Sequence, residues 1–103
     1  MTKYHARKVV IDGFTFDSQA EGRRYSELLL LCKAGEITNL VPHPVYPLVV
    51  NGQKIGAYIA DFTYLTGTGR VVEDVKGVKT PVYRLKRKLV KALYGIDIVE
   101  VTE

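Results

Sequence analysis

The segment YIADFTYLTGTGRVVEDVKG (residues 58–77) restricts the possible folds of this chain more than any other part of the sequence. Two runs of β-prone residues flank Gly67-Thr68-Gly69, a turn of the kind that joins neighbouring antiparallel strands. If the first two of these residues form a two-residue turn, the register places Asp61 directly opposite Asp74. The sequence therefore predicts a hairpin that brings two carboxylates together.

Side-chain alternation extends the same argument to Lys76. Successive side chains along a strand point to opposite faces of the sheet, so Asp74 and Lys76 share one face and Glu73 points away. The same register sets Ile59 opposite Lys76. A β-bulge in this strand would exchange the two acids and place Glu73 beside Asp61 instead.

Two facing carboxylates with apolar neighbours are expected to bind a cation. Like charges opposite each other destabilise a ladder, and charges in apolar surroundings must be paired or bind a metal. A hard divalent cation such as magnesium, held by Asp61 and Asp74, removes this conflict and can lower the pKa of an attacking water. Lys76 would orient that water or neutralise a phosphoryl group. The alternative interpretation is a structural ion pair on a solvated face, in which Lys76 neutralises both acids.

Turn and helix signals divide the rest of the chain into short elements. Asp12-Gly13 and Asn51-Gly52 are hairpin turns, and Ser18 and Thr80-Pro81 begin helices. Prolines keep the segment after Ile37 on a sheet edge or in an irregular connection. The predicted order is a β-hairpin, a helix, three strands, a helix and a strand. The hairpin covers Lys8–Ile11 and Phe14–Phe16, and the first helix Ser18–Lys33. The three strands cover Tyr46–Val50, Lys54–Leu65 and Arg70–Lys76, the second helix Pro81–Tyr94 and the last strand Ile96–Val101.

This order predicts an α/β domain of mixed α+β type, with a central mixed sheet flanked by two helices. The 103 residues suffice for a single domain, residues 1–103, with one core. Cys32 is the only cysteine, which excludes an internal disulfide and a cysteine-rich zinc site. The sequence has neither a secretory signal nor an apolar run that could span a bilayer, so we expect a soluble intracellular protein without a membrane partner.

Glu21 is the third acidic candidate. Ser18 and Glu21 form the S-x-x-E pattern of a capping box, which by itself accounts for this glutamate. Glu21 also lies on one helical stripe with Tyr25, Leu28 and Cys32, and we expect that stripe to face the sheet. The two roles are compatible, and we expect its carboxylate to contribute to the metal site.

The second predicted helix has an apolar face and a basic face, and no acid occurs between Gly77 and Ile96. The apolar face, which we expect to pack on the sheet, consists of Val82, Leu85, Leu89, Ala92 and Leu93. A solvated outer face explains most such basic stripes, but this helix also starts just after Lys76 and offers amide groups to a phosphate. We therefore expect a DNA-binding surface of Lys79, Thr80, Tyr83, Arg84, Arg87, Lys88 and Lys91, extended by Arg7 and Lys8 and by Lys3, His5, Arg23 and Arg24.

Taken in order, the motifs FDSQAE, IADF and VVEDVKG, followed by a basic helix, resemble the PD-(D/E)XK nuclease superfamily. More narrowly, the chain is similar to short phage- and prophage-encoded proteins related to Holliday junction resolvases. The resemblance extends from about Val9 to Val99. Each motif is short, and the specificity comes from their order and from their strand–strand–helix context.

The resemblance implies a restriction-endonuclease-like core of αβββαβ type and an endodeoxyribonuclease of the crossover-junction type. It also implies Mg²⁺ or Mn²⁺ as cofactor, branched or duplex DNA as substrate, and a homodimer. The implied location is the cytoplasm, which for a phage protein is the cytoplasm of the host cell. Glu21 and Asp61 match the acids of the first helix and the central hairpin, and Asp74 with Lys76 matches the acid–x–lysine pair. The variable edge of the site is matched by Thr80, Tyr83 and Arg84.

The sequence departs from the family pattern at Gly22, inside a helix, and at His43, where a polar amide is common; neither is a metal ligand. Three hypotheses follow. The first is an endonuclease acting on four-way junctions, the second a nuclease acting on nicked, linear duplex or single-stranded DNA, and the third a non-catalytic DNA-binding module. The joint presence of Asp61, Asp74 and Lys76 favours the two enzymes, because a degenerate site usually loses one of these residues.

Overall fold

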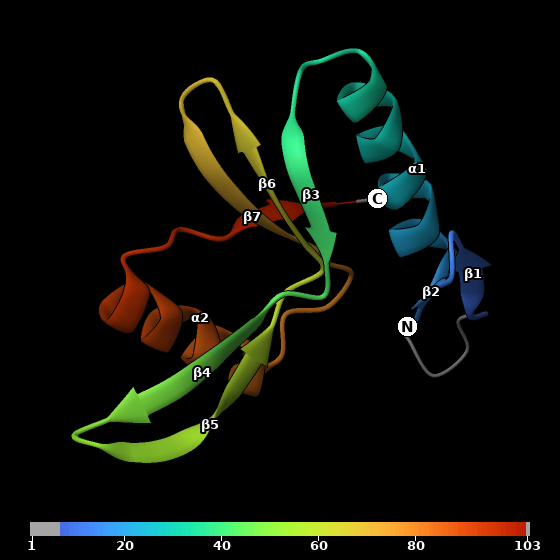
Figure 1. The fold of residues 1–103 in the computed structure, drawn as a ribbon. Helices are drawn as coiled ribbons and strands as arrows, with labels where there is room; N and C mark the ends of the chain where they lie inside the picture. The colour runs from blue at the N-terminus through green and yellow to red at the C-terminus, as the bar shows by residue number, and fades with distance from the viewer. Residues whose placement is uncertain (1–6, 103) are drawn as a thin grey trace.

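A computed structural model describes residues 7–102 of the chain (Figure 1). Lys3 and His5, expected on the DNA surface, lie outside this range. Neither helix among the described residues is long and apolar enough to cross a membrane. The elements of the described range are β1 Val9–Ile11, β2 Phe14–Phe16, α1 Gln19–Lys33, β3 Thr38–Pro42, β4 Val45–Val50, β5 Gln53–Ile59, β6 Phe62–Thr66, β7 Gly69–Val75, α2 Pro81–Tyr94 and β8 Val99–Val101.

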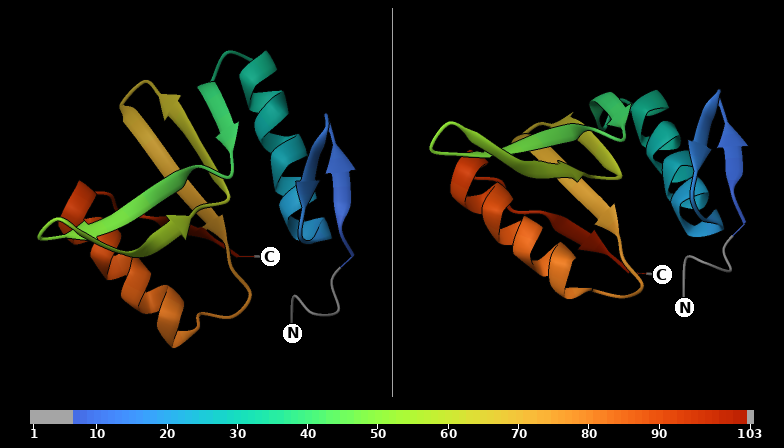
Figure 2. Two further views of the ribbon diagram at one scale, coloured as in Figure 1. Left: turned by 60° about the horizontal axis from the view of Figure 1, so that its bottom comes forward. Right: turned by 90° about the horizontal axis from the view of Figure 1, so that it is seen from below.

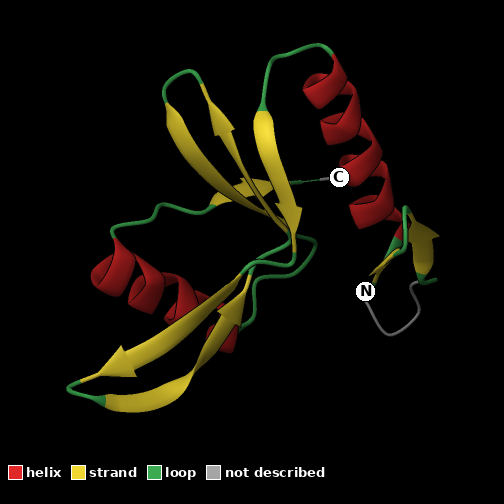
Figure 3. Ribbon diagram, viewed as in Figure 1, coloured by secondary structure: helices red, strands yellow, loops and turns green. Residues whose placement is uncertain are grey.

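A four-stranded sheet with strand order β3-β6-β7-β8 forms the centre of the fold (Figure 3). Strands β3, β6 and β7 pair antiparallel, whereas β8 pairs parallel to β7, so the sheet is mixed. Elements α1, β3, β6, β7, α2 and β8 follow each other in αβββαβ order, with the hairpin β4–β5 inserted between β3 and β6. The predicted fold class, a mixed α+β domain with a central sheet, is confirmed.

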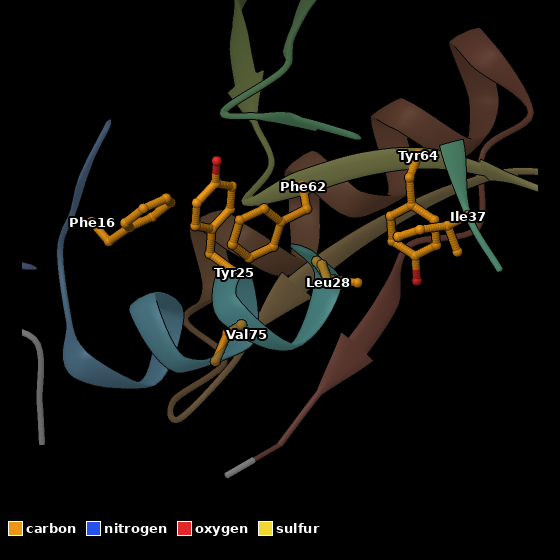
Figure 4. Close-up of a cluster of buried hydrophobic side chains, with 7 residues drawn as sticks. All are labelled: Phe16, Tyr25, Leu28, Ile37, Phe62, Tyr64 and Val75. Atoms are coloured by element: carbon orange, nitrogen blue, oxygen red, sulfur yellow. The ribbon is translucent and has the colours of Figure 1, made fainter. Parts of the chain in front are cut away.

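Helix α1 packs on one face of this sheet, and α2 packs mainly on the hairpin β4–β5 on the other side, each with its own cluster of buried side chains (Figure 2). Strand alternation sends Val75 to the α1 face and Val72 to the α2 face. The α1 cluster consists of Phe16, Tyr25, Leu28, Ile37, Phe62, Tyr64 and Val75 (Figure 4). The α2 cluster consists of Leu48, Tyr58, Ala60, Val72, Tyr83 and Val90.

The central hairpin has the predicted register. Thr66 pairs with Gly69 at the turn, and Phe62 pairs with Glu73 at the far end of the ladder. A two-residue turn imposes this register, because each step away from the turn moves one residue along both strands. The position next to Phe62 is Asp61, and the position next to Glu73 is Asp74.

The predicted strand Lys54–Leu65 is wrong as a single element, because the chain changes partner in its middle. Strand β5 ends at Ile59, which pairs with Val45 of β4, and β6 begins at Phe62. The expected pairing of Ile59 with Lys76 is therefore absent from the described ladders. The prolines have the predicted effect, since β3 ends at Pro42 and lies on the edge of the sheet.

Helix α1 presents the predicted face. Its buried residues include Glu21, Tyr25 and Leu28, and the hydroxyl of Ser18 accepts a hydrogen bond from the Glu21 N–H at 3.2 Å. Packing explains why glycine stands at position 22 inside the helix, where the sequence departs from the family pattern. A Cβ at this position would lie 3.2 Å from Cγ1 of Val9, so glycine lets strand β1 lie close against the helix.

Helix α2 buries a different face from the predicted one. Tyr83 and Val90 are buried, whereas Val82, Leu85 and Leu93 are exposed. Of the other residues expected in the core, Leu89 is half-buried and Ala92 is exposed. The buried face is the one on which Tyr83 and Val90 pack against Leu48, Tyr58 and Val72. Two hydroxyls bond to neighbouring strands: that of Tyr83 donates to Glu100 in β8, and that of Tyr94 donates to the Pro47 carbonyl in β4.

Candidate active site

Asp61 and Asp74 meet where the chain passes from β5 to β6, and each is held by the backbone of the other's strand. The Asp61 N–H donates to Oδ1 of Asp74 at 3.0 Å, and the Val75 N–H donates to Oδ2 of Asp61 at 2.7 Å. Both carboxylates are buried. The same Asp61 N–H also donates to the Glu73 carbonyl at 3.2 Å, so after the break that follows β5 it binds the β7 strand. The predicted meeting of the two acids is present in the structure.

Lys76 follows directly after β7 and points to the same side as Asp74. Its Nζ lies 3.5 Å from Oδ2 of Asp74 and 3.9 Å from the centre of the Tyr83 ring. The acid and the aromatic face both attract the ammonium group, and together they fix its position. The side chain of Lys76 is 19% exposed, so it forms the boundary between the buried acids and solvent.

Tyr58 belongs to this site although no motif in the sequence marked it. It is buried on β5, and its hydroxyl donates a short hydrogen bond to Oδ2 of Asp74. Burial and this contact with Asp74 raise the pKa of the Tyr58 hydroxyl well above its ordinary value, so it remains a donor. Tyr58 reaches Asp74 from β5, which pairs with β4 and not with β7, and local sequence patterns did not predict this change of partner.

The replacement Tyr58→Phe is expected to lower the free energy of unfolding by about 1–3 kcal/mol, because a buried carboxylate oxygen loses its donor. Urea denaturation measures this change. Tyr46→Phe is the matched control, since Tyr46 pairs with Tyr58 across the hairpin and stacks on its ring. Equal stability of Tyr58→Phe and the wild type would show that the hydroxyl does not support Asp74.

Glu73 lies on the other face of the sheet, as alternation predicts. It is fully buried under α1, where Arg24 binds both of its oxygens at 2.7 and 3.1 Å and the Tyr64 hydroxyl donates at 2.6 Å. Strand β7 has no bulge in its pairing with β6. Asp74 is therefore the acid that joins Asp61 and Lys76, and Glu73 anchors the sheet to the first helix.

Glu21 is buried at the start of α1, and its negative charge acts on Asp61. Within residues 7–102, however, no group of three or more Asp, Glu, His or Cys side chains is arranged to hold a metal ion. The structure thus brings two of the three predicted acids into direct contact and leaves the third as an electrostatic neighbour. Glu21 also has the predicted capping position beside Ser18.

The electrostatics of the site centre on Asp61. Burial, together with the negative charges of Asp74 and Glu21, raises the pKa of its carboxyl to about 8, and the hydrogen bond from the Val75 N–H opposes the shift. Asp61 therefore binds a proton in neutral solution unless another positive charge takes its place.

A divalent cation fits this pair. Asp61 and Asp74 offer hard carboxylate oxygens, the donors that magnesium and manganese prefer, and magnesium retains several waters when few protein ligands are present. A bound cation would replace the proton on Asp61, because metal ligands must be deprotonated. The raised pKa of Asp61 thus has the sign expected of a site that takes up positive charge.

The basic residues of α2 are partly neutralised, contrary to the sequence-based expectation. Glu100 follows the helix in the chain and binds Lys79 at 2.8 Å and Arg87 at 2.9 Å. Lys79, with Tyr83 and Arg87, lowers the pKa of the Glu100 carboxyl to about 2, so the acid is ionised across the neutral range. The helix sequence gave no sign of this acid, because Glu100 lies on β8, next to Asp74 in the ladder.

The remaining predicted DNA-binding residues are divided between two places. Lys91 pairs with the exposed Asp97 at 2.8 Å, and the Thr80 hydroxyl accepts from the Tyr83 N–H as the helix N-cap. Arg84 and Lys88 are exposed and have no acidic partner among residues 7–102. Arg7 and Lys8 are exposed and directly precede β1, which packs on α1, and Figure 1 shows β1 at the other end of the molecule from α2. Arg24 is bound to Glu73.

Fold and site together define a small α+β domain with a buried pair of acids and a lysine where its central hairpin begins. Residues 1–100 match the family described as "Protein of unknown function (DUF1064)", and the chain belongs to this family. A comparison with curated proteins gives no match.

Proposed function

We propose that this protein is a metal-dependent DNA endonuclease of the PD-(D/E)XK superfamily, which hydrolyses phosphodiester bonds in branched DNA, at four-way junctions. The observation that carries the proposal is the buried Asp61–Asp74 pair with Lys76 at 3.5 Å from Asp74. Acids that gather a cation and an amine that neutralises phosphate are the parts that phosphodiester hydrolysis needs. The αβββαβ order of the elements supports the same superfamily.

In this proposal each residue of the site has one task. Asp61 and Asp74 would hold Mg²⁺ or Mn²⁺, and the cation, when bound, would supply an acidified water and stabilise charge on the phosphoryl oxygens. Lys76, fixed between Asp74 and the Tyr83 ring, would place its ammonium group against the phosphate at the edge of the site. Tyr58 would keep Asp74 oriented through its hydrogen bond.

The proposed substrate follows from the charges near the site. Arg84 and Lys88 are exposed on α2, whose first turn lies beside Lys76 through Tyr83, and exposed bases bind the phosphates of DNA through counterion release. Four-way junctions need two cuts, so we propose a homodimer with one active site in each copy. The proposed location is the cytoplasm.

Cleavage assays on junction, nicked duplex, linear duplex and single-stranded DNA test this proposal, each with Mg²⁺, with Mn²⁺ and with a chelator. We expect metal-dependent cutting that is fastest on the four-way junction. If only another of these DNA forms is cut, that form is the substrate in place of the four-way junction, and the proposed metal-dependent hydrolysis still holds. Binding without any cutting in either metal would identify a DNA-binding module and overturn the proposal.

A further inference from the structure

The hairpin β4–β5 forms a two-stranded sheet of its own, which projects beyond the four-stranded sheet (Figures 1 and 2). Its inner face packs on α2 through Leu48 and Tyr58. An isolated two-stranded hairpin is marginally stable in water, and packing against a helix stabilises it. Helix α2 covers the inner face of this hairpin, so the outer face is the one left for another partner.

The outer face of the hairpin is apolar and open to solvent. The register places Val45 opposite Ile59, Pro47 opposite Ala57 and, nearer the tip, Val49 opposite Lys54, with Ile55 unpaired at the bulge beside them. Val45, Val49, Ile55 and Ile59 are between 43% and 61% exposed. We call Val45, Pro47, Val49, Ile55, Ala57 and Ile59 the hairpin face. Contiguous exposed apolar surface on a small domain marks a protein–protein contact.

The distribution of charge indicates what covers the hairpin face. The chain has a net charge of +4, with 15 basic and 11 acidic residues, so two copies repel each other over most of their surface. Lys54 is the only charged residue from Val45 to Ile59, and it lies by the turn at the tip. The hairpin face therefore has no basic stripe for a nucleic acid and no charged pattern for a partner of opposite sign.

A two-fold axis fits such a surface. An isologous contact places the same patch of each copy against the other, which requires a patch that does not repel itself. When two hairpins pack antiparallel, their tips point in opposite directions, and the two Lys54 side chains lie at opposite ends of the contact. The uncharged part between Val45 and Val49 then packs on its own copy.

The exposed apolar residues of α2 meet these conditions less well. Leu85 lies between the exposed bases Arg84 and Lys88, and Val82 lies two residues before Arg84. A two-fold contact through this stripe would bring those bases of both copies together, at a cost in free energy. The helix stripe therefore provides a matched control surface, of equal exposure and different electrostatics.

We propose that the hairpin face is the surface through which two copies of this chain form a two-fold symmetric dimer. The proposal rests on the homodimer of the proposed function and assigns its interface. Tyr58 lies on the inner face of the same strand, one residue from Ile59, so the contact would order the strand that supports Asp74. Dimer formation would in this way stabilise the active site through β5, the strand that carries Tyr58.

Sedimentation equilibrium at micromolar concentration tests this interface. We expect the wild type at twice its chain mass of 11.5 kDa, and Ile59→Lys with a dissociation constant raised at least about 100-fold, because two lysines enter an apolar contact. The matched control is Val82→Lys, since Val82 is 62% and Ile59 58% exposed; it should remain dimeric. Val45→Lys, on the paired strand, should behave as Ile59→Lys, and unchanged thermal melting verifies that each variant folds.

Three outcomes would overturn this interface: a monomeric wild type, a dimer of Ile59→Lys and Val45→Lys as tight as the wild type, or dissociation by Val82→Lys in their place. The proposed cleavage is tested by a separate result. Asp74→Asn should remain dimeric and lose cleavage, so a dimer that cuts no DNA contradicts the proposed cleavage alone. A monomer that cuts contradicts the homodimer and its interface and leaves the cleavage chemistry intact.

Discussion

Replacement of Asp74 by asparagine or alanine is expected to reduce DNA cleavage by at least about 100-fold, the low end of the loss when one transition-state contact is removed. Asp74 accepts hydrogen bonds from Tyr58 and from the Asp61 N–H and lies 3.5 Å from Lys76, so every other part of the site is positioned through it. Binding to the same DNA should be largely unchanged, because the exposed bases are on α2.

Two measurements separate these effects for Asp74: single-turnover cleavage of a labelled four-way junction, and gel-shift binding to that junction in a chelator. Asp97→Asn is the control, because Asp97 is an exposed acid at the end of α2 that pairs only with Lys91 among the described residues. It should cut at the wild-type rate. Cleavage by Asp74→Ala at the wild-type rate would show that the site is elsewhere in the chain.

The metal-free protein is expected to lose stability as the pH rises from about 4 to about 8. The pKa of Asp61 is about 8 in the folded chain, against 3.8 for a freely solvated aspartate, the value that applies to the unfolded chain. Between these values the unfolded chain releases a proton that the folded chain keeps, so a higher pH favours unfolding. Each pH unit inside this window costs about 1.4 kcal/mol.

Urea denaturation in a chelator at several pH values from about 5 to about 8 measures this dependence, and a decrease of at least about 2 kcal/mol is expected over that range. Asp61→Asn should flatten it, since an amide does not titrate, while Asp97→Asn should retain it. Added Mn²⁺ should restore stability near pH 8 in the wild type and not in Asp61→Asn, because the cation replaces the proton. The same pH dependence in the wild type and in Asp61→Asn would contradict the role of Asp61.

The predictable parts of the site depend on short-range geometry. The two-residue turn at Gly67–Thr68 sets the register of β6 and β7, and alternation then separates Glu73 from Asp74. Neither step needs knowledge of the rest of the chain, because each hydrogen-bonded pair follows from the previous one. The helix starts at Ser18 and Thr80 were predictable for the same reason, since a cap binds an amide three residues away.

The parts of the site that the sequence did not predict depend on contacts between helices and strands that are distant in the sequence. Tyr58 reaches Asp74 because the chain changes partner between Ile59, which pairs with β4, and Phe62, which pairs with β7. Glu100 reaches Lys79 and Arg87 through the parallel pairing of β8, a contact between residues distant in the sequence. Local periodicity carries no information on either event.

The sequence by itself determined the meeting of Asp61 and Asp74 and the side of β7 on which Lys76 lies, because turns and alternation act over a few residues. Tertiary structure alone decided which face of α2 is buried. Apolar spacing predicts one face of a helix, but the buried face of α2 is the one whose Tyr83 and Val90 pack against side chains of β4, β5 and β7. Which face is buried depends on the side chains that other elements present to the helix, and Val82, Leu85 and Leu93 of the apolar stripe stay in contact with solvent.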